Sequence, residues 1–346
     1  MSTNFQQLAQ VLPALENHPR APLFSRSSDL EPLHNLGQHL GIKLDAKRDD
    51  SLPLAMGGNK VRQLEYYLGQ AVAKNADTVL ITGAVQSNFV RLCAAAARKL
   101  RMRPILQLED RVPKDDVAYN TSGNVLLLKL MGCEIEYFPE GENESAADAN
   151  LDRLAAEVKA EGGNPFVIHL GIDHPPIGAL GYAAAAVETW LQHRALGEMP
   201  DHVVVPSGSG LTHAGFLVGA RAIGWDVSVL GICVRRGATQ QSVRILRRAN
   251  EVAELLGGKV TITEADVQVD DTSLAPGYGQ MNAQVLKAIR SAAQKEALLL
   301  DPVYSGRTMA GLLDHLESGV IKPGEHVTFI HTGGTPAIFA YQSDLQ

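Results

Sequence analysis

The sequence predicts an α/β protein with two parallel β-sheets, each covered by helices on both faces. Short and nearly all-apolar runs alternate along the chain with long stretches of helical periodicity. Strands that are buried on both faces are continuously apolar, whereas strands with one solvated face alternate between apolar and polar residues. The length of 346 residues is also sufficient for two domains of ordinary size.

The expected strands are short and rich in valine, isoleucine and leucine, and the expected helices are longer. The strands are expected at residues 78–82, 104–108, 134–138, 166–168, 202–206, 227–232 and 327–330. The helices are expected at residues 88–100, 120–131, 146–161, 177–193, 212–223, 239–256, 282–295 and 306–317. The polar residues 139–145 are expected to form a solvated loop.

Composition and charge exclude several classes of protein. The net charge is -7, there is no basic block and aromatic residues are few, so nucleic-acid binding has little support. No apolar run is long enough to span a bilayer, and residues 1–7 lack the features of a signal peptide. Cys93, Cys133 and Cys233 are widely spaced, without metal-ligand spacing. We therefore expect a cytoplasmic protein with reduced thiols and no metal site.

The most informative motif is Gly57-Gly58-Asn59-Lys60, where a polar loop is expected to turn into a helix. Glycines allow close approach of a bound group and unusual dihedral angles. Asn59 is a favourable N-cap residue. Lys60 would then lie in the first helical turn, where the helix dipole helps to lower its pKa. A lysine with a lowered pKa can act as a nucleophile on an aldehyde.

The loop 83–88 follows an expected strand and precedes an expected helix. In open parallel sheets, ligands bind outside the carboxyl ends of the strands. Ser87 and Asn88 can cap the helix, or they can present a hydroxyl, an amide and backbone N–H groups to a carboxylate. Both interpretations stay open at this point.

The loop 206–215 also connects a strand to a helix and contains Ser-Gly-Ser-Gly-Leu-Thr. Backbone N–H groups and hydroxyls in such a loop are typical of a phosphate site. The dinucleotide fingerprint would require glycine at position 213, where the chain has His213, and no acidic residue follows the next strand. The loop therefore favours one phosphate of a small cofactor over the pyrophosphate of NAD.

Three further residues are candidates for the same pocket. Thr332 lies in the loop 331–336 after the last strand and offers a hydroxyl. Tyr278 and Tyr304 lie in glycine-containing loops, from which a tyrosine can reach into a cleft as a proton donor or acceptor. The alternatives are a tight turn for the threonine loop and packing for the tyrosines.

The order of these motifs resembles that of one enzyme family. Gly-Gly-Asn-Lys is followed by Gln-Ser-Asn, Ser-Gly-Ser-Gly-Leu-Thr, Pro-Gly-Tyr-Gly, Asp-Pro-Val-Tyr-Ser-Gly and His-Thr-Gly-Gly-Thr-Pro. The set is similar to the pyridoxal-phosphate family that contains D-cysteine desulfhydrase and 1-aminocyclopropane-1-carboxylate (ACC) deaminase, with the tryptophan synthase β-like fold (fold type II). The resemblance extends from Lys47 to Tyr341.

This resemblance implies pyridoxal 5'-phosphate as the cofactor, with Lys60 holding it as a Schiff base and moving protons at the substrate α-carbon. The implied catalytic residues are Lys60, Ser87, Tyr278 and Tyr304. The implied cofactor-binding residues are Asn59, Lys60, Asn88, Gly208, Ser209, Gly210, Leu211, Thr212 and Thr332. The implied substrate-binding residues are Gln86, Ser87, Asn88, Phe89, Tyr278 and Tyr304.

The resemblance also implies a substrate class. ACC deaminases have a glutamate and a leucine where this chain has Gly277 and Thr332, which favours the desulfhydrase branch and β-elimination from D-cysteine. Phe89 stands where many desulfhydrases have histidine, so it either marks a changed pocket or packs in the core. His169, Asp173 and His174 are expected to line the same cleft. The alternatives are elimination from L-cysteate, β-chloro-D-alanine or D-serine, ACC deamination and an amino-acid-binding module without catalysis.

By resemblance, residues 56–175 form a smaller, mobile α/β domain, and residues 1–55 and 176–346 form a larger, cofactor-binding one. The cofactor is expected between them. The expected partners are a small amino-acid substrate and a second copy of the chain in a homodimer, without nucleic acid or membrane.

Overall fold

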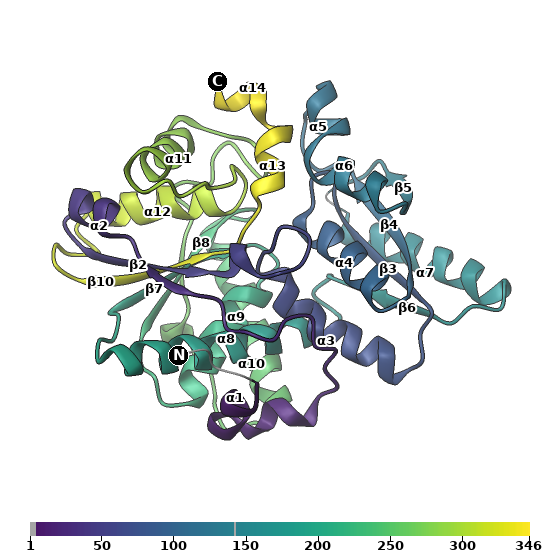
Figure 1. The fold of residues 1–346 in the computed structure, drawn as a ribbon, viewed down its shortest axis with the longest axis horizontal. Helices are drawn as coiled ribbons and strands as arrows, with labels where there is room; N and C mark the ends of the chain where they lie inside the picture. Colours follow the sequence, from purple (N-terminus) through teal and green to yellow (C-terminus); the bar gives the residue numbers. More distant parts are fainter. Residues whose placement is uncertain (1–4, 142) are drawn as a thin grey trace.

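The chain folds around two β-sheets that lie in separate lobes (Figure 1). The computed structural model describes residues 5–141 and 143–346. Residues 1–4 of the N-terminal segment and Glu142 of the predicted loop 139–145 lie outside the described residues. We call the four-stranded sheet with α4–α7 the small lobe, and the six-stranded sheet with its helices the large lobe.

The small lobe has the strand order β5-β4-β3-β6, and every neighbouring pair is parallel. Alternate residues of a strand point to opposite faces. Val79 and Ile81 of β3 belong to the main core, together with residues of α4, whereas Leu80 packs with residues of α7. Both faces of this sheet are therefore covered. The strands are β3 (Thr78–Ala84), β4 (Arg103–Glu109), β5 (Glu134–Phe138) and β6 (Pro165–Ile168), and the helices are α4 (Asn88–Lys99), α5 (Val117–Thr121), α6 (Gly123–Leu130) and α7 (Glu144–Ala160).

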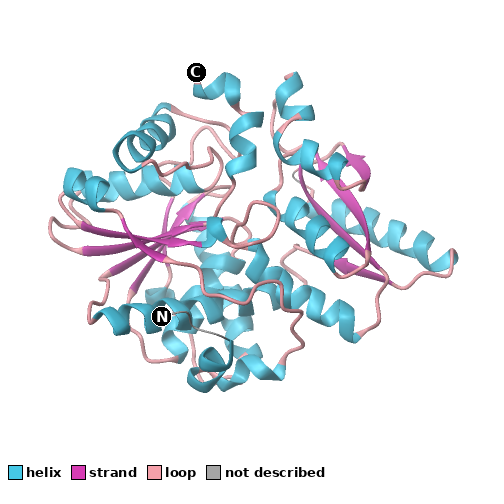
Figure 2. Ribbon diagram, viewed as in Figure 1, coloured by secondary structure: helices cyan, strands magenta, loops and turns pink. Residues whose placement is uncertain are grey.

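The large lobe has the strand order β1-β2-β10-β7-β8-β9, with only the β1–β2 pair antiparallel among the described residues. Helices α11 and α12 cover one face, and α8, α9 and α10 lie on the other (Figure 2). The strands are β1 (Leu30–Pro32), β2 (Lys43–Arg48), β7 (His202–Ser207), β8 (Ser228–Cys233), β9 (Gln268–Asp270) and β10 (His326–His331). The helices are α1 (Phe5–Val11), α2 (His34–Leu40), α8 (Leu180–Leu196), α9 (Leu211–Ala222), α10 (Ala238–Leu255), α11 (Ala283–Glu296), α12 (Ser305–Glu317), α13 (Thr335–Ala340) and α14 (Gln342–Leu345).

The predicted strands and helices are present, with some differences at their ends. The predicted helix 120–131 is divided at Ser122 into α5 and α6, because Gly123 has a positive φ of 58°. The predicted helix 177–193 begins as a 3-10 turn, Ile177–Ala179, before α8. Strands β1, β2 and β9 were not predicted. Strand β2 contains the charged residues Asp45 and Lys47, so its sequence does not look like that of a buried strand. Both side chains are nevertheless buried, because each is paired inside the protein.

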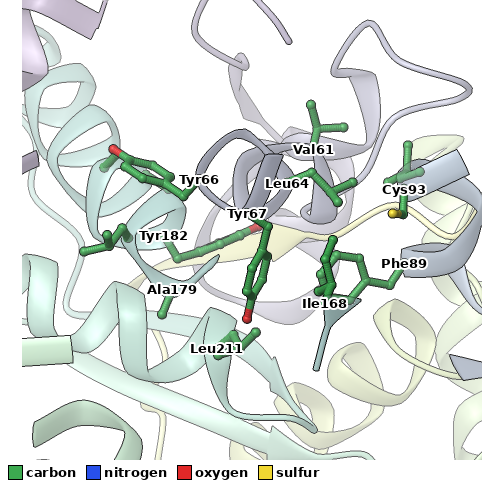
Figure 3. Packing of buried hydrophobic residues seen from close by; sticks show 14 of the residues in the cluster. Val61, Leu64, Tyr66, Tyr67, Phe89, Cys93, Ile168, Ala179, Tyr182 and Leu211 are labelled. Carbon is green, nitrogen blue, oxygen red and sulfur yellow. The ribbon is translucent and has the colours of Figure 1, made fainter. Parts of the chain in front are cut away.

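Helix α3 (Lys60–Ala73) lies between the lobes and carries the motif lysine at its first position. Figure 3 shows its residues Leu64 and Tyr67 near Phe89 of the small lobe and Leu211 of the large lobe. The ring centroids of Tyr67 and Phe89 are 6.2 Å apart. The core is thus continuous through α3, so that residues of both lobes are held next to the start of this helix.

Buried ion pairs fix α3 to the large lobe. Arg62, in the first turn of the helix, donates hydrogen bonds to both Asp49 and Glu188. Lys47 also pairs with Glu188, and all four side chains are at most 2% exposed. No helix of the described residues is long and apolar enough to cross a membrane.

Candidate active site

One pocket lies where the carboxyl ends of the strands of both lobes face each other. The loops after β3, β4, β7, β8 and β10 contribute to its wall, together with the start of α3. This is the position at which open parallel sheets bind ligands. The residues predicted from the sequence that line it are Asn59, Lys60, Ser87, Asn88, Phe89, Gly208, Ser209, Gly210, Thr212, Tyr278, Tyr304 and Thr332.

Lys60 is the first residue of α3, as the sequence predicts. Its Nζ atom lies 5.2 Å from the centroid of the Phe89 ring. Burial lowers the pKa of Lys60 to about 8. A large fraction of neutral amine near pH 8 is what a nucleophilic lysine needs. Asn59 occupies the N-cap position of α3, as expected, but its side chain makes no capping hydrogen bond.

The loop before Lys60 is held in place by contacts with several elements. A Cβ atom on Gly57 would come within 1.9 Å of the carbonyl oxygen of Asp50, and φ of Gly57 is 63°, so glycine is required there. The carbonyl of Gly57 accepts a 2.7 Å hydrogen bond from the buried Arg91. The N–H of Asn59 donates to the carbonyl of Thr332 at 3.1 Å. The last of these contacts joins the lysine loop directly to the threonine loop.

The Ser-Gly-Ser-Gly-Leu-Thr loop ends at the N-terminus of α9, where free N–H groups and the helix dipole favour an anion. The hydroxyl of Thr212 accepts hydrogen bonds from the side-chain amides of Asn59 and Gln63, each at 2.9 Å. Its proton is therefore free to be donated to a ligand. Leu211 does not line the pocket, because its side chain packs in the main core.

The loop after β3 combines capping and pocket-lining residues. Ser87 caps α4 by accepting a hydrogen bond from the N–H of Val90 at 3.2 Å, and its hydroxyl still lines the pocket. Asn88 also faces the pocket, and its oxygen accepts a 3.0 Å hydrogen bond from Asn124. The prediction for Gln86 is corrected. Its amide bonds to Asn124 and to the carbonyls of residues 119 and 122, which places it in the loop framework outside the pocket lining.

Phe89 both packs in the core and lines the pocket, the two positions that the sequence left open for it. The ring is only 6% exposed and belongs to the main core, and it also forms part of the pocket wall beside Lys60. Its contribution to the wall is an apolar surface that donates no conventional hydrogen bond.

Tyr278 and Tyr304 meet at the pocket, with their phenol oxygens 2.7 Å apart. Burial, reinforced by the neighbouring Tyr278, raises the pKa of Tyr304 well above its ordinary value. Tyr304 is therefore protonated at neutral pH and can donate a proton only as part of a reaction that develops negative charge beside it.

Thr332 has a buried hydroxyl without a hydrogen-bond partner among the described residues. Buried polar groups are almost always paired, so such a hydroxyl in a pocket wall indicates a missing ligand atom. A planar cofactor with a ring nitrogen, a phosphate and an aldehyde fits the surrounding groups. The Thr332 hydroxyl suits the nitrogen, the Ser-Gly-Ser-Gly-Leu-Thr loop suits the phosphate, and Lys60 suits the aldehyde.

Charged residues that the sequence did not reveal also line the pocket. Arg111 follows β4 and makes a bidentate pair with Glu109, while Arg235 and Arg244 lie close to Glu144 at the start of α7. These arginines follow β4 and β8, in segments without a glycine-rich motif. The sequence would have indicated them only if every segment after a strand had been considered as part of the site. The additional pocket residues with charged side chains are Glu109, Arg111, Glu144, Asp148, Arg235 and Arg244.

The prediction that His169, Asp173 and His174 line the cleft was wrong. The two imidazole rings stack on each other with centroids 4.0 Å apart, and they pair with acidic residues of α7. Asp173 pairs with the exposed Arg247. The segment instead contributes Leu170 and Gly171 to the pocket.

The fold and the pocket together define an α/β enzyme that holds an anionic, aldehyde-bearing cofactor beside a lysine. The family model described as "Pyridoxal-phosphate dependent enzyme" matches residues 23–333. The chain belongs to this family, and its cofactor is pyridoxal phosphate. The predicted fold class, cofactor and family are thereby confirmed.

The relatives agree with this assignment over nearly the whole chain. The D-cysteine desulfhydrase of Yersinia enterocolitica is 40% identical over 332 residues, 96% of this chain and 98% of that protein. The D-cysteine desulfhydrase of Klebsiella pneumoniae (strain 342) is 39% identical over 331 residues, again 96% and 98%. A crystal structure of an ACC deaminase homologue is 34% identical, with a TM-score of 0.85 over 97% of this chain and 98% of that one.

Proposed function

We propose that the enzyme catalyses β-elimination from D-cysteine, in which D-cysteine and water give pyruvate, ammonia and hydrogen sulfide. The proposal is supported by full-length identity of 39–40% to proteins named D-cysteine desulfhydrase. The observation that carries it is the meeting of Lys60, Ser87 and the Tyr278–Tyr304 pair around one pocket. These groups can move a proton, bind a carboxylate and protonate a leaving group.

The substrate carboxylate is assigned to the N-terminus of α4. The Ser87 hydroxyl accepts its hydrogen bond from Val90, which leaves its proton available to an oxygen of the substrate. The free N–H groups and the dipole of α4 favour a negative charge at the same place. This arrangement orients the α-carbon of the amino acid toward Lys60 across the pocket.

The cofactor is assigned to other groups of the same pocket, with its phosphate at Gly208–Thr212, its ring oxygen at Asn88 and its ring nitrogen at Thr332. When bound, pyridoxal phosphate supplies an electron sink that stabilises negative charge at the substrate α-carbon. The Lys60 amine, with its pKa lowered to about 8, is suited to removing and returning a proton there.

The tyrosine pair is assigned to the leaving group. Tyr304 is held protonated by burial, and its phenol is 2.7 Å from that of Tyr278. A proton donated by one phenol to the departing sulfur can be replaced through the other. The negative charge that develops on sulfur supplies the driving force for this transfer.

Two residues argue against the alternative of ACC deamination. Gly277 has φ of 154°, a conformation that a glutamate side chain at this position would adopt only with strain. Thr332 then offers the ring nitrogen a neutral hydroxyl, which keeps that nitrogen protonated less effectively than a carboxylate does. Opening of a cyclopropane ring requires the stronger electron sink, whereas expulsion of sulfide does not.

The test is a panel of amino acids on the purified holoenzyme, with pyruvate, 2-oxobutyrate and sulfide measured separately. The panel contains D-cysteine, L-cysteine, β-chloro-D-alanine, L-cysteate, D-serine and ACC, with Lys60→Ala as the control. We expect pyruvate and sulfide from D-cysteine, and neither from the variant. Turnover of another compound with none of D-cysteine would overturn the proposed substrate, and inactivity on the whole panel would overturn the lyase itself.

We also propose that the enzyme works as a cytoplasmic homodimer on a small amino acid. Cys93, Cys133 and Cys233 are free thiols in the structure, which is consistent with a reducing compartment. Light scattering after size-exclusion chromatography measures the mass directly. A mass near 37.1 kDa, that of one chain, would contradict the dimer.

A further inference from the structure

Arg111 occupies the loop after β4, one strand away from the site assigned to the substrate carboxylate. In the small sheet Ala84 at the end of β3 is paired with Glu109 at the end of β4. Ser87 follows the first of these ends and Arg111 follows the second, and both residues line the pocket. The two residues therefore lie on loops that follow neighbouring strands at the same edge of the sheet.

The guanidinium of Arg111 is held in a fixed orientation by Glu109. Its Nε and one Nη2 hydrogen donate to the two carboxylate oxygens, both at 2.7 Å. Glu109 is fully buried and also accepts a hydrogen bond from the hydroxyl of Thr82. The cation is thus positioned by a buried carboxylate that lines the pocket beside it.

Part of this guanidinium remains available to a ligand. An arginine has five N–H donors, and two of them are used by Glu109. The structure shows no other hydrogen bond from Arg111 to a described residue. Arg244, by contrast, donates to the carbonyls of Ser209 and Leu170 and lies 3.6 Å from Glu144.

Arg111 is also close to the tyrosine pair. Burial and Tyr278 raise the pKa of Tyr304, and the positive charge of Arg111 acts in the opposite direction. The same three groups line the pocket. A substituent on the substrate β-carbon that lies near the tyrosines therefore shares the pocket with the guanidinium of Arg111.

We propose that Arg111 is a specificity-determining residue that binds a negatively charged substituent on the β-carbon of the amino acid. The proposal rests on the proposed function, because it uses the same pocket and the same assignment of the α-carboxylate to Ser87. The substrate class is then an amino acid whose β-substituent carries or develops negative charge, such as a thiolate or an oxyacid group. A neutral hydroxyl gains much less from a guanidinium.

Two amino acids without a β-leaving group test this binding without any turnover. Aspartate and asparagine have nearly the same shape and differ in the charge of the β-substituent. Each is titrated into the holoenzyme, and the change in cofactor absorbance gives its Kd. Both configurations are measured. We expect the wild type to bind aspartate of one configuration about tenfold more tightly than the matching asparagine.

The Arg111→Gln variant should bind the two amino acids equally, because only the aspartate contact has been lost. This variant leaves Glu109 buried without its partner, which can impair folding. The double variant Glu109→Gln/Arg111→Gln removes both charges and serves as the second test. Arg247→Gln is the matched control, since Arg247 is 47% exposed and pairs with Asp173 and Glu251 outside the pocket lining.

Three results would overturn the proposal. The first is an aspartate preference that persists in both Arg111 variants. The second is an equal loss of affinity for aspartate and asparagine, which would place Arg111 at the α-carboxylate. The third is a wild-type enzyme that does not prefer aspartate in either configuration. Failure of the proposed function is seen separately, as the absence of pyruvate from D-cysteine, because these titrations need no elimination.

Discussion

The phenol oxygens of Tyr278 and Tyr304 lie 2.7 Å apart, on loops separated by 26 positions in the chain. Because proton transfer by a positioned side chain contributes about 10²–10⁴-fold to a rate, we expect Tyr304→Phe to lower kcat for D-cysteine by about 100-fold or more. Steady-state sulfide release measures this effect. A variant with an unchanged cofactor spectrum and a kcat within twofold of the wild type would remove Tyr304 from the proposed protonation step.

The unpartnered hydroxyl of Thr332 gives a prediction that needs no turnover. Thr332→Val preserves the shape of the side chain and removes only the hydroxyl. Since the hydroxyl bonds to no described residue, the stability of the cofactor-free protein should not fall. Cofactor affinity should weaken about three- to tenfold if the hydroxyl binds the ring nitrogen.

The matched control for Thr332 is Thr189→Val, outside the pocket lining. The Thr189 hydroxyl donates to the carbonyl of Ala185 at 2.8 Å, so its removal should lower stability and leave cofactor affinity unchanged. Titration of the cofactor and thermal unfolding of both cofactor-free variants separate the two effects. Unchanged cofactor affinity in Thr332→Val would contradict the assignment of the ring nitrogen.

The residues predicted from the sequence and those that were missed differ in a physical respect. Position 57 requires glycine, since a Cβ atom there would clash with the backbone of Asp50. A requirement of this kind for one residue type can be recognised in the sequence. Glu144 is an ordinary charged residue until folding pairs it with arginines of the other lobe, and Arg111 is one until folding places the loop after β4 at the pocket. Their function depends on a placement that no local pattern identifies.

Strand β2 was missed for the same reason. Its Asp45 and Lys47 look like solvated charges, but they are buried and bonded to His326 and Glu188, which lie more than 140 positions away. Strands whose side chains are apolar, such as β3 and β7, were predicted because burial alone explains their composition. The division of the chain at residues 56–175 remains a prediction.

The lowered pKa of Lys60 makes a prediction for the cofactor-free protein. Burial lowers the pKa from 10.5 to about 8. Between these values the unfolded chain holds a proton that the folded chain has released, so the free energy of unfolding increases with pH across this window. Wild-type protein should therefore gain stability relative to Lys60→Met as the pH rises from about 8 to 10.5, with no relative change below pH 7.

Urea unfolding of the cofactor-free wild type and Lys60→Met at several pH values measures this difference. Lys287→Met is the control, because Lys287 is 70% exposed and should show no such window. A difference between wild type and Lys60→Met that does not depend on pH would mean that the Lys60 amine keeps its ordinary pKa.

The buried network around Arg62 predicts a large effect on stability. Arg62 donates hydrogen bonds to Asp49 and Glu188, and all three side chains are at most 2% exposed. Arg62→Met should lower the free energy of unfolding by about 3–5 kcal/mol, because two buried carboxylates lose a partner. The control is Arg103→Met, whose exposed pair with Glu134 should be worth less than about 1 kcal/mol. Similar losses in the two variants would contradict this account of how α3 is anchored.

Glu144 forms ion pairs that join the two lobes at the pocket. It lies at the start of α7 in the small lobe and contacts Arg235 at 3.0 Å, Arg236, and Arg244 at 3.6 Å in the large lobe. Although burial acts in the opposite direction, the charges of these arginines hold the pKa of Glu144 below its ordinary value. The contact is therefore ionic at neutral pH and should be weakened by salt.

We expect Glu144→Gln to lower kcat/KM for D-cysteine about three- to tenfold, because a weaker contact between the lobes leaves the pocket open to water for more of the time. Added salt should lower kcat/KM of the wild type and have less effect on the variant. Glu161→Gln is the control, since Glu161 pairs with the exposed Arg103 within the small lobe. An equal response to salt in wild type and Glu144→Gln would show that this ion cluster does not control access to the pocket.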